Sequence, residues 1–229
     1  MKLRREHWRK YKLEFWKRLW EDLEIGYLDE DLLPILIKLN IDAGFYTMSS
    51  CSGRVVFSDS KYPWSREETS IVYKKHYPIS VEEAAHILDK PVVRRLWVNV
   101  SGPIIHVSTD RLSRAKLLLK LARKAGLKHS GILSINPSKG IIVELMSGIK
   151  MTQLLKTPYK QIVPEDRLAD LVNLMNEVLI AGKHILLKLE EAIKDFLPLE
   201  EDEEVLRDLA GRGIDYSKLS VKSILARYI

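Results

Sequence analysis

The sequence predicts a mixed α/β (α+β) domain in which helices flank a partly antiparallel sheet. Segments with helical periodicity alternate with short runs rich in valine, isoleucine and tyrosine, which are typical of strands. Two of these runs flank the turn sequence Pro137–Gly140, so they are expected to form an antiparallel hairpin. No glycine-rich loop joins an early strand to a helix, which argues against a doubly wound, Rossmann-type fold.

The N-terminal region predicts two helices. Apolar residues recur at helical spacing between Leu3 and Leu23, and basic residues fall largely between them, which indicates an amphipathic helix with a basic face. A second helix is expected over Asp29–Leu39, after a turn at Gly26, with Asp29 as its N-cap.

The middle of the chain predicts short strands interrupted by two helices. The expected strands are Tyr46–Met48, Val55–Ser58, Ser70–His76, Leu96–Val100, Ile104–Ser108, Gly131–Asn136 and Ile141–Met146. The first two of these are expected to flank a serine-rich turn. Ser80 is expected to begin a helix that ends near Leu88. Asp110 is expected to cap another helix, which ends at Gly126.

The C-terminal region has a different pattern. Apolar residues at helical spacing over Glu165–Phe196 predict one long helix or a helical pair, with Gly182 as a possible break. We therefore expect a main α/β domain at residues 1–159 and a helical region at residues 160–229 that packs on it.

Composition limits the class of protein. Among 229 residues, 46% are hydrophobic and 30% are charged, which is ordinary for a globular protein. The net charge of +6 agrees with a polyanionic partner and equally with a solvated surface that happens to be basic. One cysteine permits neither an internal disulfide nor a cysteine-based metal cluster. No apolar run approaches the ~18 residues of a membrane span, and no signal-peptide pattern is visible. A cytoplasmic protein without a membrane partner is expected.

The segment YTMSSCSGRVVF, residues 46–57, is the most distinctive local pattern. Small hydroxyl side chains and Gly53 allow a ligand to approach the backbone, and the guanidinium of Arg54 can bind a carboxylate or phosphate. A polar turn that its own serines stabilise is the alternative. Cys51 is interpreted as a small packing residue, although a nucleophilic thiolate beside a cation is the competing hypothesis.

Three histidines are candidates for orienting a ligand or carrying a proton. His76 ends a predicted strand, His106 lies within one, and His129 precedes the turn at Ser130. A structural histidine that hydrogen-bonds within the protein is the common alternative. Their spacing matches no short zinc signature, so no metal is expected.

Four segments in the same order resemble the tRNA wybutosine-synthesising protein 3 family. The resemblance covers about Phe15 to Thr152, and its segments are FWKRLWEDLEIGYLDEDLLPILIKLN, YTMSSCSGRVVF, SIVYKKH and PIIHVSTDRLSRAKLLLKLARKAGLKHSGI. The second segment is similar to the family signature Ser-x-Ser-Ser-Cys-x-Gly-Arg, with Thr47 in the first serine position.

The resemblance implies an archaeal-type methyltransferase of wybutosine biosynthesis. Such an enzyme uses S-adenosylmethionine to methylate N4 of the tricyclic purine derivative at position 37 of tRNA-Phe, beside the anticodon. The resemblance implies that the catalytic residues are His76 and Arg54. It implies that the cofactor is bound by Ser49, Ser50, Ser52 and Gly53, and that the substrate is bound by Thr47, His106, His129 and Ser130.

Two other functions agree with parts of the sequence. A noncatalytic RNA-binding protein would share the positive charge but would not bind S-adenosylmethionine. A cysteine-dependent hydrolase would require the thiol of Cys51, whereas the methyltransferase interpretation predicts that Cys51→Ser retains substantial activity.

Overall fold

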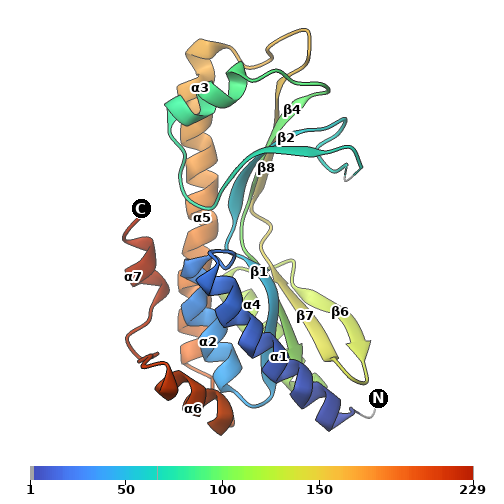
Figure 1. Ribbon diagram of the computed structural model, residues 1–229, viewed down its shortest axis with the longest axis vertical. Helices are drawn as coiled ribbons and strands as arrows, with labels where there is room; N and C mark the ends of the chain where they lie inside the picture. The colour runs from blue at the N-terminus through green and yellow to red at the C-terminus, as the bar shows by residue number, and fades with distance from the viewer. Residues whose placement is uncertain (1–2, 66, 229) are drawn as a thin grey trace. The chain divides into compact units, whose positions relative to one another are not determined.

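The computed structural model describes residues 3–65 and 67–228 as two compact units (Figure 1). Unit 1 contains the segment that ends at Ser52, together with Pro103–Gly148 and His184–Arg227. Unit 2 contains Gly53–Gly102 and Ile149–Lys183, with Tyr228. The chain is therefore divided differently from the expected division at residue 160, because each unit includes part of the C-terminal region.

Unit 1 contains a four-stranded antiparallel sheet in the order β1-β5-β7-β6. Its strands are β1 (Phe45–Cys51), β5 (Ile104–Thr109), β6 (Gly131–Asn136) and β7 (Gly140–Met146). Helix α4 packs against β5 and β7, while α1 and α2 pack against β1. The helices of this unit are α1 (Arg5–Glu24), η1 (Glu30–Leu32), α2 (Leu33–Ile41), α4 (Leu112–Ala125), α6 (Glu203–Gly211) and α7 (Val221–Leu225), together with the last part of α5 from His184 onward.

Apolar stripes explain why the helices of unit 1 pack on its sheet. Trp16, Leu19 and Trp20 form the buried side of α1, and they join a core that also contains Leu118 and Leu121 of α4. Helix α4 ends at a glycine, as expected, because Gly126 adopts a φ of 98°, which disfavours other residues.

Unit 2 contains a second antiparallel sheet in the order β3-β2-β4-β8. Its strands are β2 (Arg54–Asp59), β3 (Ser70–Lys75), β4 (Leu96–Ser101) and β8 (Lys150–Lys156). One face of the sheet packs on α3 (Val81–Asp89) and on the first part of α5 (Leu168–Lys194), which follows the short helix η2 (Glu165–Arg167). A capping box between Ser80 and Glu83 begins α3 where the sequence predicts it.

The structure confirms a mixed α+β fold outside the Rossmann class, but it corrects the predicted serine-rich turn. Residues Ser49–Cys51 belong to β1, so only Ser52 and Gly53 separate β1 from β2, and these two strands lie in different sheets. Gly53 has a φ of 100°, and a Cβ there would approach the carbonyl oxygen of Ser101 to 2.7 Å. Only glycine fits this connection without strain.

Of the two predicted aspartate caps, the position of one is confirmed and the other is wrong. Asp29 is the N-cap residue of η1, but its side chain makes no capping hydrogen bond; instead its Oδ2 accepts a hydrogen bond from the amide of Ser52, at 2.7 Å. Arg111, not Asp110, is the N-cap residue of α4, and Asp110 pairs with Arg111 and Arg114. Strand β8 was not predicted. Helices α6 and α7 lie in the region 160–229 that was predicted to be helical, although their bounds were not predicted, and α5 continues through Gly182 without a break. None of the helices in the described part of the chain has the length and apolar character that a membrane span requires.

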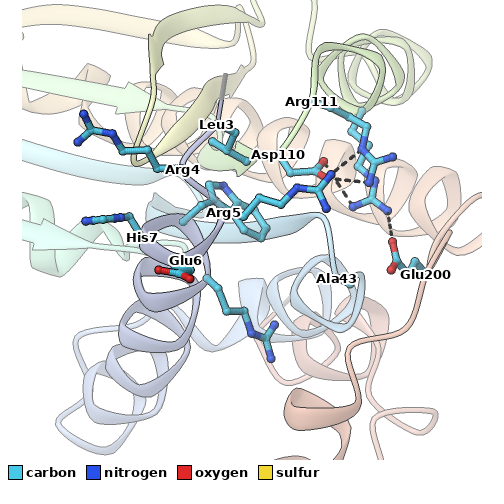
Figure 2. A pocket seen from close by; sticks show the side chains of 12 residues that line it. Leu3, Arg4, Arg5, Glu6, His7, Ala43, Asp110, Arg111 and Glu200 are labelled. Atoms are coloured by element: carbon cyan, nitrogen blue, oxygen red, sulfur yellow. Dashed lines mark hydrogen bonds and ion pairs between the residues drawn. The ribbon is translucent and has the colours of Figure 1, made fainter. Parts of the chain in front are cut away.

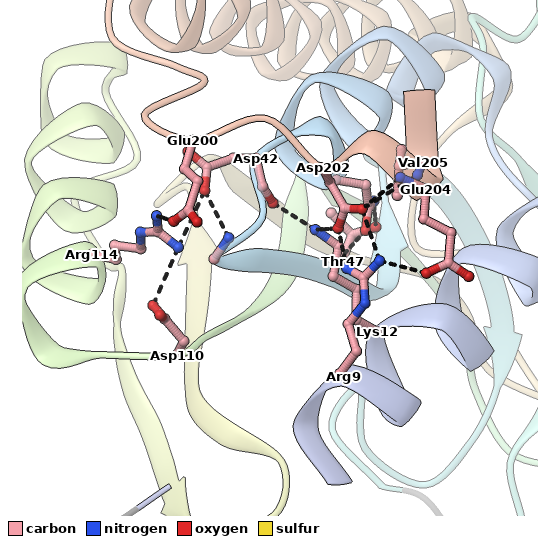
Figure 3. A network of polar contacts seen from close by, with 12 residues as sticks. Arg9, Lys12, Asp42, Thr47, Asp110, Arg114, Glu200, Asp202, Glu204 and Val205 are labelled. Atoms are coloured by element: carbon pink, nitrogen blue, oxygen red, sulfur yellow. Dashed lines mark hydrogen bonds and ion pairs between the residues drawn. The ribbon is translucent and has the colours of Figure 1, made fainter. Parts of the chain in front are cut away.

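A buried ionic network joins α1 to α6 in unit 1 (Figure 3). The side chain of Lys12 is fully buried, with its Nζ 2.7 Å from Asp202 and 2.6 Å from the carbonyl oxygen of Asp42. Asp202 also pairs with Arg9 and caps α6 by accepting hydrogen bonds from the amides of Glu204 and Val205. This one carboxylate therefore compensates a buried charge and begins a helix.

Protonation of Asp202 should destabilise unit 1 in acid. Although desolvation alone would raise the pKa of the Asp202 carboxyl, its hydrogen bonds with Arg9 and Lys12 lower that pKa from 3.8 to about 2. The unfolded chain therefore binds more protons at this group between pH 3.8 and about 2, so its contribution to stability is complete above this range and is lost as the pH falls through it. Denaturant midpoints measured from about pH 5 downward should fall more steeply for the wild type than for Asp202→Asn. If the denaturant midpoints of the wild type and of Asp202→Asn fell equally steeply with pH, Asp202 would not be the group responsible.

Candidate functional site

A cavity of about 350 Å³ lies beside the serine segment of β1 in unit 1. Strand β1 contributes Thr47, Met48, Ser49 and Ser50 to its lining; α1 contributes Phe15, Arg18, Leu19 and Asp22; and the remaining lining residues are Tyr27, Leu28 and Leu36. The α1 residues share one side of the helix because they are three or four positions apart. The cavity thus combines apolar walls, hydroxyl groups, one cation and one carboxylate.

Hydrogen bonds fix the strand that forms this wall. The buried hydroxyl of Thr47 accepts a hydrogen bond from Nδ2 of Asn40 at 2.7 Å, and its amide donates to Oδ1 of the same side chain at 3.3 Å. At the helix side, Nε of Arg18 lies 3.4 Å from Oδ2 of Asp22. The Arg18 side chain is largely exposed, so its guanidinium can also reach a ligand's carboxylate.

His106 bridges three strands of the unit 1 sheet. It lies on β5, and its Nδ1 is 2.9 Å from the carbonyl oxygen of Ser49 on β1. Its Nε2 is 3.0 Å from Oε2 of Glu144 on β7, the residue directly opposite it. Both ring nitrogens therefore have partners within the unit, and the imidazole fixes the backbone at Ser49.

His129 and Ser130 form a connection after α4 and do not line the 350 Å³ cavity. The Ser130 hydroxyl donates to the carbonyl of Leu127 and accepts from the amide of Met146, at 2.8 and 3.0 Å. A Cβ on Gly148 would lie 2.6 Å from Nε2 of His129, so the imidazole covers this glycine closely. These contacts hold the connection against the end of β7.

Arg54 and His76 belong to unit 2, where the structure brings them to the same end of neighbouring strands. Val55 pairs with Lys75, so Arg54, the first residue of β2, and His76, which directly follows β3, lie at the same end of these two strands. Arg54 also pairs with Ser101 on the other side of β2. Arg54 is exposed and His76 is half-buried.

The remaining predicted cofactor ligands, Ser52 and Gly53, connect the two units along the chain. Both residues are buried, and Ser52 is held through the hydrogen bond between its amide and Asp29. Asp29 fixes the chain at the point where β1 ends.

A larger hollow of about 1000 Å³ surrounds the start of α1 in unit 1 (Figure 2). Its lining contains more basic than acidic side chains, and the charged and histidine residues are Arg4, Arg5, Glu6, His7, Arg9, Asp110, Arg111, Arg114 and Glu200. Asp110 and Glu200 pair with Arg111 and Arg114, whereas neither Arg4 nor Arg5 joins an ion pair within residues 3–65 and 67–228. This surface attracts anionic partners.

The comparisons with known proteins agree with this architecture. The family model described as Methyltransferase TYW3 matches residues 10–195, which include the cavity and both sheets. The match places the protein in a class of methyltransferases that lack a Rossmann fold. The chain belongs to the Methyltransferase TYW3 family.

Archaeal relatives carry a specific name. The chain is 42% identical over 177 residues to a Saccharolobus solfataricus protein named tRNA(Phe) 7-((3-amino-3-carboxypropyl)-4-demethylwyosine(37)-N(4))-methyltransferase, covering 77% of this chain and 84% of the relative. A relative of the same name from Aeropyrum pernix is 34% identical, with 72% and 87% covered. The solved structure of the PH1069 protein from Pyrococcus horikoshii matches with a TM-score of 0.77 and 32% identity, over 82% of this chain and 96% of that one.

Proposed function

We propose that this chain transfers a methyl group from S-adenosylmethionine to N4 of the tricyclic base at position 37 of tRNA(Phe). Its relatives are named for this reaction, with the base carrying a 3-amino-3-carboxypropyl group. The observation that carries the proposal is the cavity at Thr47–Ser50, because this strand belongs to the segment that resembles the family signature. The protein is a methyltransferase of wybutosine biosynthesis.

The residues around this cavity fit the chemical groups of S-adenosylmethionine. Arg18 suits the carboxylate of its methionine part, Asp22 suits the amino group, and the hydroxyls of Ser49 and Ser50 suit further polar atoms. The ring of Phe15 offers an apolar surface for an adenine. When bound, this cofactor supplies a methyl group on a sulfonium centre.

Arg54 and His76 provide groups that a methyl acceptor needs. The guanidinium of Arg54 suits the carboxylate of the base's aminocarboxypropyl group, or a phosphate. His76 accepts the proton that the methylated nitrogen loses, directly or through a water. We retain the prediction that the substrate is bound by Thr47, His106, His129 and Ser130. We also retain the prediction that Ser52 and Gly53 bind the cofactor.

The reaction can be tested on isolated tRNA. The protein is incubated with S-adenosylmethionine and with tRNA(Phe) that carries the unmethylated tricyclic base, and the nucleosides are then analysed by mass spectrometry. Addition of one methyl group to this nucleoside, dependent on both protein and cofactor, supports the proposal. Unchanged nucleosides would overturn it. Calorimetry with S-adenosylmethionine distinguishes this function from the alternative of a noncatalytic RNA-binding protein, which predicts that the cofactor does not bind.

Arg18→Ala should weaken binding of S-adenosylmethionine about 10- to 150-fold, since a charge-assisted hydrogen bond contributes about 1.5–3 kcal/mol. Isothermal titration calorimetry measures this change directly. Lys17→Ala is a matched control, because Lys17 is the preceding residue on α1, is also exposed, and pairs with Glu21. Equal affinities in both variants would exclude Arg18 as a cofactor ligand.

A further inference from the structure

Two aromatic side chains are stacked and exposed in the connection between β2 and β3 of unit 2. The ring centroids of Tyr62 and Trp64 are 5.2 Å apart, and their planes differ by 1°. Trp64 is 76% exposed and Tyr62 is 40% exposed. This pair presents a flat π surface to solvent, the kind of surface on which nucleic-acid bases stack.

Hydrogen bonds anchor the chain just before this aromatic pair. The carboxylate of Asp59 accepts hydrogen bonds from three successive amides, those of Val93, Arg94 and Arg95, at 2.6–3.0 Å. The carbonyl of Ser60 accepts from the indole of Trp97 at 3.2 Å. The connection therefore begins from a fixed base, and the aromatic pair loses little conformational entropy when a ligand binds.

Positive charge accompanies the aromatic pair. Nζ of Lys61 lies 5.6 Å, and the guanidinium carbon of Arg95 5.7 Å, from the centroid of the Tyr62 ring. Arg95 also donates to the carbonyl of Lys61 at 2.9 Å, which holds the two basic residues together. An aromatic surface with adjacent cations complements a base and its phosphate.

One face of the unit 2 sheet also carries polar, basic and aromatic side chains. The register places Val56, Lys74, Asn99 and Thr152 on the face opposite the apolar core, and Thr152 donates to Asn99 across the strands at 2.8 Å. Trp97 and Lys150 occupy other rows of the same face. Both lysines are exposed, and every residue named here is at least partly exposed. We call these six residues the open face.

We propose that the Tyr62–Trp64 pair and the open face of unit 2 bind the tRNA substrate, with an unpaired base stacked on Trp64 and phosphates held by Lys61, Lys74 and Lys150. This inference rests on the proposed function, because that function supplies an RNA partner. The charge of this surface favours a nucleic acid over a basic protein as its partner. Three exposed lysines beside stacked aromatic rings match a polyanion with planar bases, and the lysines would repel a basic protein surface.

Binding of tRNA(Phe) by the full chain, followed by fluorescence anisotropy, tests this surface. Trp64→Ala should raise the dissociation constant about 5- to 100-fold, since stacking on an aromatic side chain contributes about 1–3 kcal/mol per base. KM for tRNA should rise with kcat unchanged at saturating tRNA. Lys61→Ala should lower the slope of log affinity against log salt by about 1. Tyr159→Ala is the matched control, because that ring is 96% exposed in the same unit.

The outcomes separate this inference from the proposed function. If the wild type methylates tRNA and Trp64→Ala binds tRNA with unchanged affinity, the surface is wrong and the function stands. If the wild type fails to methylate but Trp64→Ala weakens tRNA binding, the function is wrong and the surface stands. If Trp64→Ala instead abolishes self-association seen by light scattering while tRNA affinity is unchanged, the pair contacts protein and the proposal fails.

Discussion

Asp202→Ala is expected to lower the free energy of unfolding by about 3–5 kcal/mol, the range measured when one partner of a buried ion pair is removed. Lys12 would lose the carboxylate that stabilises its ammonium group, and α6 would lose its N-cap. Desolvation already lowers the pKa of Lys12 from 10.5 to about 8, even with Asp202 in place. Removing Asp202 should therefore drive Lys12 to its neutral form. Denaturant titration measures the change.

Matched variants identify the cause of this loss. Asp202→Asn keeps a capping side chain without the charge, so it should recover only the capping part, about 1 kcal/mol. Lys12→Met in the Asp202→Ala background should recover more, because no unpaired ammonium remains. Asp166→Ala removes a carboxylate with a 76% exposed side chain and should change stability by less than about 0.5 kcal/mol. A loss in Asp202→Ala as small as that in Asp166→Ala would contradict the network's role.

Arg54→Ala and His76→Ala are each expected to reduce methylation of tRNA at least tenfold at saturating substrates. Loss of Arg54 removes a two-point contact with a carboxylate or phosphate, and loss of His76 removes a proton acceptor. The two residues lie at the same end of β2 and β3 and outside the buried core of unit 2, so both variants should fold. Single-turnover rates, with thermal unfolding in parallel, measure the effect.

Residues of the same types in the same unit serve as controls. His86 is exposed on α3, and the Arg167 side chain is 69% exposed with pairs to Asp166 and Asp170. His86→Ala and Arg167→Ala should keep wild-type rates. Wild-type turnover in both Arg54→Ala and His76→Ala would refute the two catalytic assignments.

Local sequence patterns predicted most elements, but long-range pairing escaped them. The buried stripe of α1, the capping box at Ser80 and the hairpin at Pro137–Gly140 are each encoded by neighbouring residues. Sheet membership is not local: Thr47 pairs with Val107, while Val55 pairs with Val100 and Lys75. Proximity in sequence favoured a hairpin between β1 and β2, and tertiary pairing formed two sheets instead. Strand β8 was missed because its sequence, KMTQLLK, has no valine or isoleucine.

The same difference explains what could be predicted about the site. The serine segment was recognised by its residue types, and three of its hydroxyl side chains, those of Thr47, Ser49 and Ser50, line a cavity. The opposite wall was missed, because Phe15 and Leu19 were assigned to a buried stripe and Arg18 to a basic surface. Their spacing of three and four along α1 was the available signal. It shows which residues share a side of the helix, but not that the side meets a cavity.

The discontinuous segments of each unit have a consequence for biosynthesis. Unit 1 begins with the residues up to Ser52, yet its core includes Leu186, Leu189 and Leu225. Unit 1 therefore cannot complete its core during translation until residues beyond Lys183 have left the ribosome. The core of unit 2 is complete once Leu179 has emerged. The unit that starts later is thus able to fold earlier, the reverse of the order usual for domains that follow one another along a nascent chain.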